Sequence, residues 1–140
     1  MNDKYFLDTN ILIYSFDGRV PKKKEKTSAL IEKALTAHVG LISVQVIQEF
    51  FNVALHKFAH PLSLSDAKNY LDQVLIPLCD IFPSPALVRE ALDLQQTTGY
   101  RFYDAQIIAS AISGGCKILY TEDMQQGQNI SGLKIVNPFE

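Results

Sequence analysis

Short apolar runs followed by helix-starting residues recur along this chain of 140 residues. Buried strands are predicted at 4–7, 40–43, 81–82, 117–120 and 133–136. Helices are predicted at about 11–16, 26–38, 44–58, 85–99 and 105–113, and another runs from Ser63 or Ser65 to about 75. Ser43 and Ser84 are expected to start the helices at 44 and 85. Strands that alternate with helices indicate an α/β fold with a mostly parallel central sheet flanked by helices. We therefore predict a single α/β domain over residues 1–140, with four to five short strands.

Composition is that of an ordinary soluble domain. The chain is 47% hydrophobic, enough for one core, and no apolar run approaches the roughly 20 residues of a membrane span. Residues 1–4 lack the basic region and cleavage site of a signal peptide, so we expect a cytoplasmic protein. Cys79 and Cys116 lie in apolar segments without CxxC spacing, which favours reduced, inert thiols.

Four acidic residues border or interrupt the apolar segments: Asp8, Glu49, Asp104 and Asp123. Ligands of open parallel sheets bind outside the carboxyl ends of the strands. Asp8 and Asp123 follow two predicted strands, and Asp104 is expected to cap a helix that starts on the same side. Glu49 lies almost two turns into its helix, so its carboxylate can point toward the same edge of the sheet, which we call the mouth of the site. We therefore expect the four side chains to converge.

Such a group of carboxylates needs a cation. Two unit charges ~4 Å apart at an effective dielectric of ~20 interact by about 4 kcal/mol, so without metal at least one acid should hold a proton. Oxygen ligands suit Mg²⁺ or Mn²⁺, which can activate a water and stabilise the leaving oxygen of a phosphodiester. Each acid alone also has a structural interpretation, such as a helix cap or a solvated face. Their combination carries the prediction.

The net charge is compatible with several classes of ligand. It is formally −2, and the four acids account for more than all of it, so a metal-loaded molecule would be mildly cationic. Nucleic-acid binders are usually basic. The charge therefore neither supports nor excludes a nucleic-acid ligand.

Four segments resemble, in order, the signatures of the PIN-domain nucleases, in particular the VapC-like toxins of prokaryotic toxin–antitoxin pairs. They are Phe6–Leu12, Ser43–Glu49, Tyr103–Ala109 and Leu119–Met124. The resemblance spans almost the full chain and places the four acids at the family's acidic positions. It implies a PIN-like fold and a metal-dependent endoribonuclease that uses Mg²⁺ or Mn²⁺. It also implies an RNA substrate, a small antitoxin and a homodimer. Asp8, Glu49, Asp104 and Asp123 would then be the catalytic, metal-holding residues.

Other side chains are candidates for supporting roles. Thr9, Asn10 and Thr121 could hydrogen-bond to the metal ligands, or simply form caps and turns. Arg101 would lie near the rim of the site, where it could contact a phosphate. The basic run Lys22-Lys23-Lys24 is a weaker phosphate contact, and we expect it to lie in a mobile, solvated loop.

Two other functions compete with this prediction. Haloacid-dehalogenase-like phosphatases carry a second Asp two residues after the first, where this chain has Asn10, and receiver domains need a lysine after a late strand, where it has Thr121-Glu122-Asp123. Both are disfavoured. A PIN-like scaffold that binds RNA or a protein without cutting is the other alternative, although all four acids are present.

Overall fold

The computed structural model describes residues 3–140 and contains six short strands and seven α-helices within them. The strands are β1 (Tyr5–Leu7), β2 (Gly40–Ser43), β3 (Cys79–Ile81), β4 (Ile118–Tyr120), β5 (Asn129–Ile130) and β6 (Leu133–Val136). The helices are α1 (Thr9–Tyr14), α2 (Pro21–Ala37), α3 (Val44–Ala54), α4 (Leu64–Tyr70), α5 (Ile76–Leu78), α6 (Pro85–Thr98) and α7 (Phe102–Ser113). A π-helical turn, Leu71–Leu75, joins α4 to α5.

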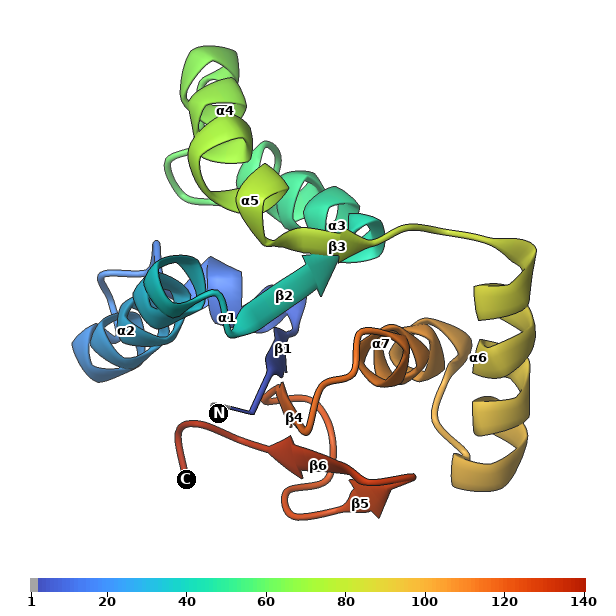
Figure 1. The fold of residues 1–140 in the computed structure, drawn as a ribbon. Coiled ribbons are helices and arrows are strands. Elements are labelled where there is room, and N and C mark those ends of the chain that lie inside the picture. Colours follow the sequence, from blue (N-terminus) through green and yellow to red (C-terminus); the bar gives the residue numbers. More distant parts are fainter. Residues whose placement is uncertain (1–2) are drawn as a thin grey trace.

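The strands form one sheet in the order β3-β2-β1-β4-β6-β5 (Figure 1). All neighbouring strands are parallel except β5 and β6. The predicted α/β fold with a mostly parallel central sheet is therefore confirmed. The sequence prediction lacked β5, because a strand of two residues is too short to show a period of two.

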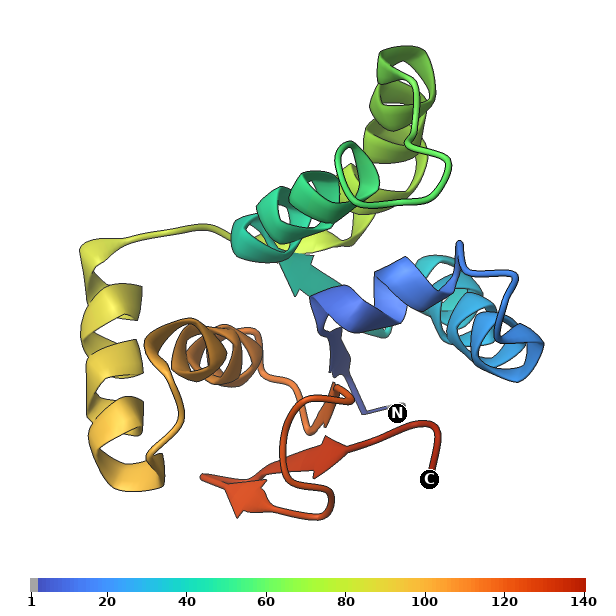
Figure 2. The same cartoon turned by 180° about the vertical axis from the view of Figure 1, so that it is seen from behind.

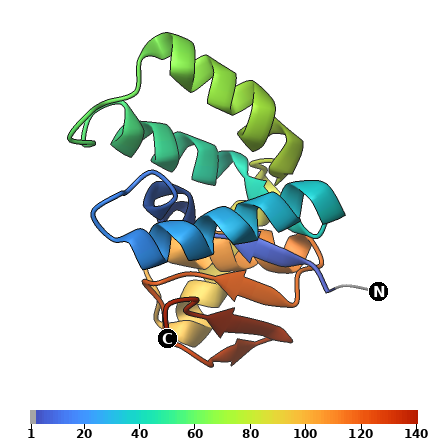
Figure 3. The ribbon, with the colours of Figure 1, turned by 90° about the vertical axis from the view of Figure 1, so that its left-hand side faces the viewer.

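Helices cover both faces of the sheet. Helix α2 lies in front of the strands in Figure 3, and α7 and α6 lie behind them. Helices α1 and α3 instead leave the carboxyl ends of β1 and β2. Helix α4 lies beside α3 at one end of the molecule (Figure 2), where the rings of Phe50 and Tyr70 are 5.2 Å apart. None of the helices in residues 3–140 is long and apolar enough to cross a bilayer.

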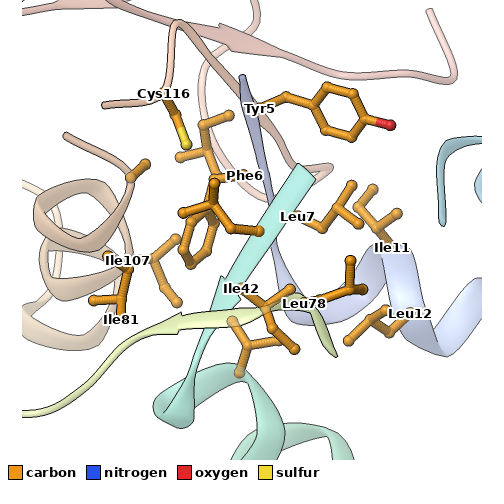
Figure 4. Packing of buried hydrophobic residues seen from close by; sticks show 14 of the residues in the cluster. Tyr5, Phe6, Leu7, Ile11, Leu12, Ile42, Leu78, Ile81, Ile107 and Cys116 are labelled. Atoms are coloured by element: carbon orange, nitrogen blue, oxygen red, sulfur yellow. The ribbon is translucent and has the colours of Figure 1, made fainter. Parts of the chain in front are cut away.

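The central strand β1 supplies the middle of the core. Phe6 and Leu7 are fully buried, and their side chains leave opposite faces of the strand. Phe6 points toward Ile107 of α7, whereas Leu7 lies beside Ile11 of α1 (Figure 4). Burying side chains of this size contributes about 1.5–3 kcal/mol each, so β1 is anchored firmly between the two helical layers.

Serine caps begin three helices. The hydroxyl oxygens of Ser43, Ser63 and Ser84 accept hydrogen bonds from backbone N–H groups in the first turns of α3, α4 and α6. Pro85 occupies the first position of α6, where its missing N–H costs nothing. The predicted starts of α3 and α6 are therefore correct, and of the two serines considered for α4, Ser63 is the cap.

Three helix boundaries differ from the sequence prediction. Helix α2 begins at Pro21 rather than near 26, so Lys22, Lys23 and Lys24 lie in its first turn; the expectation of a mobile loop was wrong. Pro21 occupies the first position of this helix. Helix α7 begins at Phe102 with Arg101 as its flanking residue, so Asp104 lies in the first turn and is not the cap. Helix α3 ends at Ala54 and not at 58.

The two cysteines are free, as the sequence predicted. Cys116 is buried, and burial raises the pKa of its thiol to about 12. The thiol therefore stays protonated at neutral pH, which makes it a poor nucleophile.

Candidate active site

The carboxyl ends of β1 and β4 lie side by side at the point where the strand order changes direction. From β1 the chain builds the sheet outward through β2 to β3, then returns to place β4 on the other side of β1. Such a switch point is where open parallel sheets bind ligands. The backbone N–H of Asp8 donates to the carbonyl of Tyr120 at 3.0 Å, so the pairing of these strands continues to the first acid.

Asp8 is a buried carboxylate held by two hydrogen bonds. Its Oδ1 accepts from the backbone N–H of Thr9 at 2.7 Å, which starts α1, and its Oδ2 accepts from the Thr121 hydroxyl at 2.7 Å. Burial raises the pKa of Asp8 to about 7; the hydrogen bonds from Thr121 and Thr9 oppose this rise, and the charges of Glu49 and Asp123 add to it. The protein thus keeps a carboxylate where its charge is costly.

Both carboxylate oxygens of Glu49 accept hydrogen bonds. Its Oε1 accepts a hydrogen bond from the Thr9 hydroxyl at 2.8 Å, and its Oε2 accepts one from Nε2 of Gln45 at 3.3 Å. Thr9 therefore joins two acids, donating through its backbone to Asp8 and through its side chain to Glu49. The solvated helix face that Glu49 could have occupied is excluded by these contacts.

The loop after β4 carries the third acid. Oδ2 of Asp123 accepts a hydrogen bond from Nδ2 of Asn10 at 2.8 Å, and its backbone N–H donates to the Thr121 hydroxyl at 3.1 Å. The backbone N–H of Glu122 donates to Oδ1 of Asn10 at 3.4 Å. Asn10 and Thr121 thus fix this loop to the start of α1, and Asp123 itself remains exposed.

Asp104 faces the same mouth from α7. Burial raises its pKa, repulsion by Asp123 and Glu49 raises it further, and Arg101 opposes the rise. Within residues 3–140 its carboxylate accepts no side-chain or backbone hydrogen bond that would fix its direction. Asp104 is therefore the acid with the least constraint on its orientation.

The four acids share one edge of the sheet but do not form a ready-made metal cluster. As placed, no three Asp, Glu, His or Cys side chains in residues 3–140 could hold a metal ion together. The salt bridges in this part of the chain join Arg19 to Asp17 and Lys23 to Glu122, so none of the four acids has a cationic partner. In charge and donor type this all-oxygen group suits a hard divalent cation. Holding one would require the carboxylates to close around it.

A family comparison identifies the fold. A family model described as PIN domain matches residues 5–128. The chain belongs to the PIN-domain family. The match contains all four acids, so the PIN fold explains why residues so distant in the sequence meet at one edge of the sheet.

Solved structures share this PIN fold over nearly the whole chain. A toxin–antitoxin complex from Klebsiella pneumoniae matches with a TM-score of 0.70 and 22% identity, covering 98% of this chain and 99% of the matched chain. FitAcB from Neisseria gonorrhoeae matches with a TM-score of 0.65 and 17% identity over 96% and 98% of the two chains. VapC20 from Mycobacterium tuberculosis, a Sarcin-Ricin loop cleaving toxin, matches with 0.62 and 20% over 86% and 90%. A search of curated proteins found no match.

The basic residues that could contact a phosphate lie around the PIN-domain site and differ in exposure and ion pairing. Arg101 is exposed beside Asp104, and Lys22 and Lys24 are exposed on the first turn of α2. Lys23 is instead paired: its ammonium lies 2.5 Å from Oε1 of Glu122 and within 5 Å of the ring centres of Tyr14 and Phe139. It stabilises the loop that carries Asp123 rather than pointing at a ligand.

Sequence reasoning missed two glutamines of this PIN domain. Gln45 contacts Glu49, and Gln106 of α7 donates a hydrogen bond to Gln45 at 2.9 Å. The spacing of four between Gln45 and Glu49 signalled the first contact, because residues four apart are neighbours on a helix. No pattern in the sequence signalled Gln106, which reaches Gln45 only because the fold brings α7 near the start of α3.

Proposed function

We propose that this PIN domain is a metal-dependent endoribonuclease and the toxin of a toxin–antitoxin pair. The observation that supports this most is the set of four acids at the mouth, one of them buried, without a cationic partner within residues 3–140. A protein gains no stability from such an arrangement. It is expected where a divalent cation and a phosphate backbone are to be bound.

Asp8, Glu49, Asp104 and Asp123 would hold Mg²⁺ or Mn²⁺. Such an ion, when bound, lowers the pKa of a coordinated water and neutralises charge on a phosphodiester. The chain's own residues prepare the site: Thr9 and Thr121 fix both oxygens of Asp8, and Asn10 fixes Asp123. Asp104, which lacks such a donor, can turn to complete the group.

We assign substrate contact to the exposed basic residues at the rim of the site. Arg101 is exposed three residues before Asp104, so its guanidinium can reach a phosphate next to the scissile bond. Lys22 and Lys24 would add weaker, salt-sensitive attraction. The likeness to VapC20, a toxin that cleaves the Sarcin-Ricin loop, supports RNA as the substrate.

The likeness to solved structures also supports an antitoxin as a partner. The matched structures include toxin–antitoxin complexes of nearly the same chain length, which supports a small antitoxin protein as the partner of this chain. A homodimer stays a prediction from the family resemblance. Light scattering of the purified chain, alone and after co-expression with a candidate antitoxin, measures both assemblies.

The experiment that tests the function is sequencing of RNA ends after induced expression in cells. We expect discrete new 5′ ends with the wild-type chain and their loss with Asp104→Ala. Asp93→Ala is the matched control, because Asp93 is an exposed acid on α6 outside the site. New ends that persist in Asp104→Ala would refute the assignment, whereas their loss in both variants would point to poor folding.

One observation favours a second function. Because no three acidic, His or Cys side chains in the described residues are placed to hold an ion, a scaffold that binds RNA or protein without cutting is the alternative. Titration calorimetry with MnCl₂ separates the two. Binding that is lost in Asp8→Asn supports the nuclease, and the absence of binding to the wild-type chain supports the scaffold.

A further inference from the structure

Gln45 makes three hydrogen bonds that join α3 to α7 beside the site. Its Nε2 donates to Oε2 of Glu49 at 3.3 Å and to the backbone carbonyl of Tyr103 at 3.1 Å. Its Oε1 accepts from Nε2 of Gln106 at 2.9 Å. Tyr103 immediately precedes Asp104, so one side chain connects the turn that carries Asp104 to the carboxylate of Glu49.

The direction of these two amides is fixed by chemistry. The Glu49 carboxylate and the Tyr103 carbonyl can only accept, so the NH₂ group of Gln45 must face them. The oxygen of Gln45 then faces Gln106, which must donate. A reversed Gln45 amide would place its oxygen against two other oxygens and leave its NH₂ group against that of Gln106. Gln106 therefore supports the direction of a hydrogen bond to Glu49 without touching Glu49.

We propose that Gln45 and Gln106 are positioning residues that set the direction of the Glu49 carboxylate and hold it in register with the first turn of α7. Thr9 binds the other oxygen of Glu49 at 2.8 Å, so the carboxylate is held between α1 on one side and the two glutamines on the other. The inference rests on the proposed function, because it assigns the glutamines a role in placing Glu49 and Asp104 around a cation.

The amide pair lies outside the apolar core that holds α7 in place. Ile107 and Ile108 of α7 are almost completely buried, whereas Gln45 and Gln106 are half-buried. Hydrogen bonds between neutral groups contribute modestly to net stability, but partners that orient metal ligands typically change affinity or activity by about 10–100-fold. Changes to the pair should therefore affect the site more than the fold.

Gln106→Glu provides the sharpest test. The new carboxylate can only accept, so it would repel the oxygen of Gln45 and oppose the amide direction that presents an NH₂ group to Glu49. Gln106→Met removes the hydrogen bond without reversing it. Gln48→Glu is the matched control: it adds the same charge on the exposed face of α3, next to Glu49, at a side chain that makes no hydrogen bond within residues 3–140.

The first measurement is Mn²⁺ affinity of the full chain by calorimetry. We expect Gln106→Glu to weaken binding roughly tenfold and Gln106→Met by a smaller factor. Gln48→Glu should leave affinity unchanged or raise it, because an added negative charge attracts the cation. A loss of affinity in Gln106→Glu without a loss in Gln48→Glu separates positioning from simple electrostatics, because the added charge is the same. If both glutamates strengthen binding equally, the inference is overturned.

The second measurement is RNA cleavage, where kcat should fall in Gln106→Glu with KM nearly unchanged, because the glutamines touch no substrate. A third, independent of metal, is the nuclear Overhauser contact between the Gln45 side-chain NH₂ and Tyr103, which should vanish in Gln106→Glu. If that variant does not fold, Gln106→Met must still lower kcat and Mn²⁺ affinity for the inference to stand.

The two proposals fail in different ways. A wild-type chain that neither binds Mn²⁺ nor cleaves RNA overturns the proposed function and this inference with it. A wild-type chain that does both, with Gln106→Glu and Gln106→Met indistinguishable from it, overturns the positioning role alone.

Discussion

The two ends of strand β1 differ in how their residues affect stability. At its amino end, Tyr5 pairs with Gly40, where a Cβ atom would lie 2.4 Å from the Cβ of Ala34 and 2.9 Å from Cε2 of Tyr5. At its carboxyl end, Asp8 is equally buried but carries a carboxylate that burial and neighbouring acids destabilise. Close apolar contact marks the first end, and unbalanced charge marks the second.

The difference shows how a small domain can stay folded with a site that lowers its stability. Leu7 and Phe6 between the two ends are fully buried, so the strand stays in place whatever the charge of Asp8. Free energy gained along β1 offsets the cost at its end. The two ends should therefore respond oppositely to substitution: changes at the acids should abolish activity and spare the fold, and changes at Gly40 should do the reverse.

The largest expected effect is on catalysis. Asp8→Asn keeps the shape of the side chain but removes its charge, so a divalent cation bound as proposed would lose its most buried ligand. We expect RNA cleavage to fall by at least about 100-fold, while the melting temperature in EDTA does not fall. Gel-based cleavage assays measure the activity, and thermal melts measure the melting temperature. Undiminished Mg²⁺-dependent cleavage in this variant would contradict the assignment, and Asp93→Asn serves as the control.

The next effect is on stability as a function of pH. The pKa of Asp8 is raised from 3.8 to about 7 in the folded chain, so the folded state binds this proton more tightly than the unfolded state. The resulting stabilisation is complete below about pH 4 and is lost as the pH rises through 7, amounting to up to about 4 kcal/mol. Urea unfolding in EDTA between pH 4 and pH 8 measures it.

Asp8→Asn provides the comparison for that titration. Its free energy of unfolding should lack this decline, so its advantage over the wild-type chain should grow with pH. Added MgCl₂ should restore stability at pH 8 to the wild-type chain and not to the variant. Parallel pH curves for the two proteins would show that Asp8 does not titrate with the raised pKa.

A smaller effect is expected at the opposite end of β1. Gly40→Ala would force its methyl group into the side chains of Ala34 and Tyr5, and overpacking of this kind typically costs about 1–3 kcal/mol. The change should appear in urea unfolding, with kcat unaffected at temperatures where the variant is folded. Gly18→Ala is a suitable control, since a Cβ there would meet nothing within 4 Å.

The smallest effect concerns the ion pair that supports the loop after β4. Lys23→Met removes the ammonium that contacts Glu122 while keeping an unbranched side chain. We expect a slight fall in melting temperature that diminishes as NaCl is added, because salt screens exposed charges. A fall that is independent of salt would indicate that the packing of Lys23 against Tyr14 and Phe139 matters more than its charge.

The sequence predicted those parts of the structure that depend on local patterns and on the rules of parallel sheets. Phe6-Leu7 and Leu41-Ile42 were recognised as strands because such apolar runs can be buried only in a covered sheet. The meeting of Asp8 with the loop of Asp123 followed from parallel strands ending at one edge. The starts of α3 and α6 followed from Ser43 and Ser84.

Features that depend on packing were not predictable from one sequence. The lysines after Pro21 resemble a solvated loop, and the ion pair of Lys23 with Glu122 joins residues 99 apart in the sequence. The contact of Gln106 with Gln45 joins residues 61 apart and depends on the angle between α3 and α7. The spread of the carboxylates around the mouth likewise depends on side-chain directions that no spacing encodes.

The position of β4 in the chain has a consequence for biosynthesis. Thr121 follows Asp8 by 113 residues, and β4 must pair with β1 before the Thr121 hydroxyl can reach the Asp8 carboxylate. A nascent polypeptide that still lacks β4 holds Asp8 and Glu49 without their companions. If the enzyme cuts RNA as proposed, the order of translation delays its activity until β4 has been made and has paired with β1.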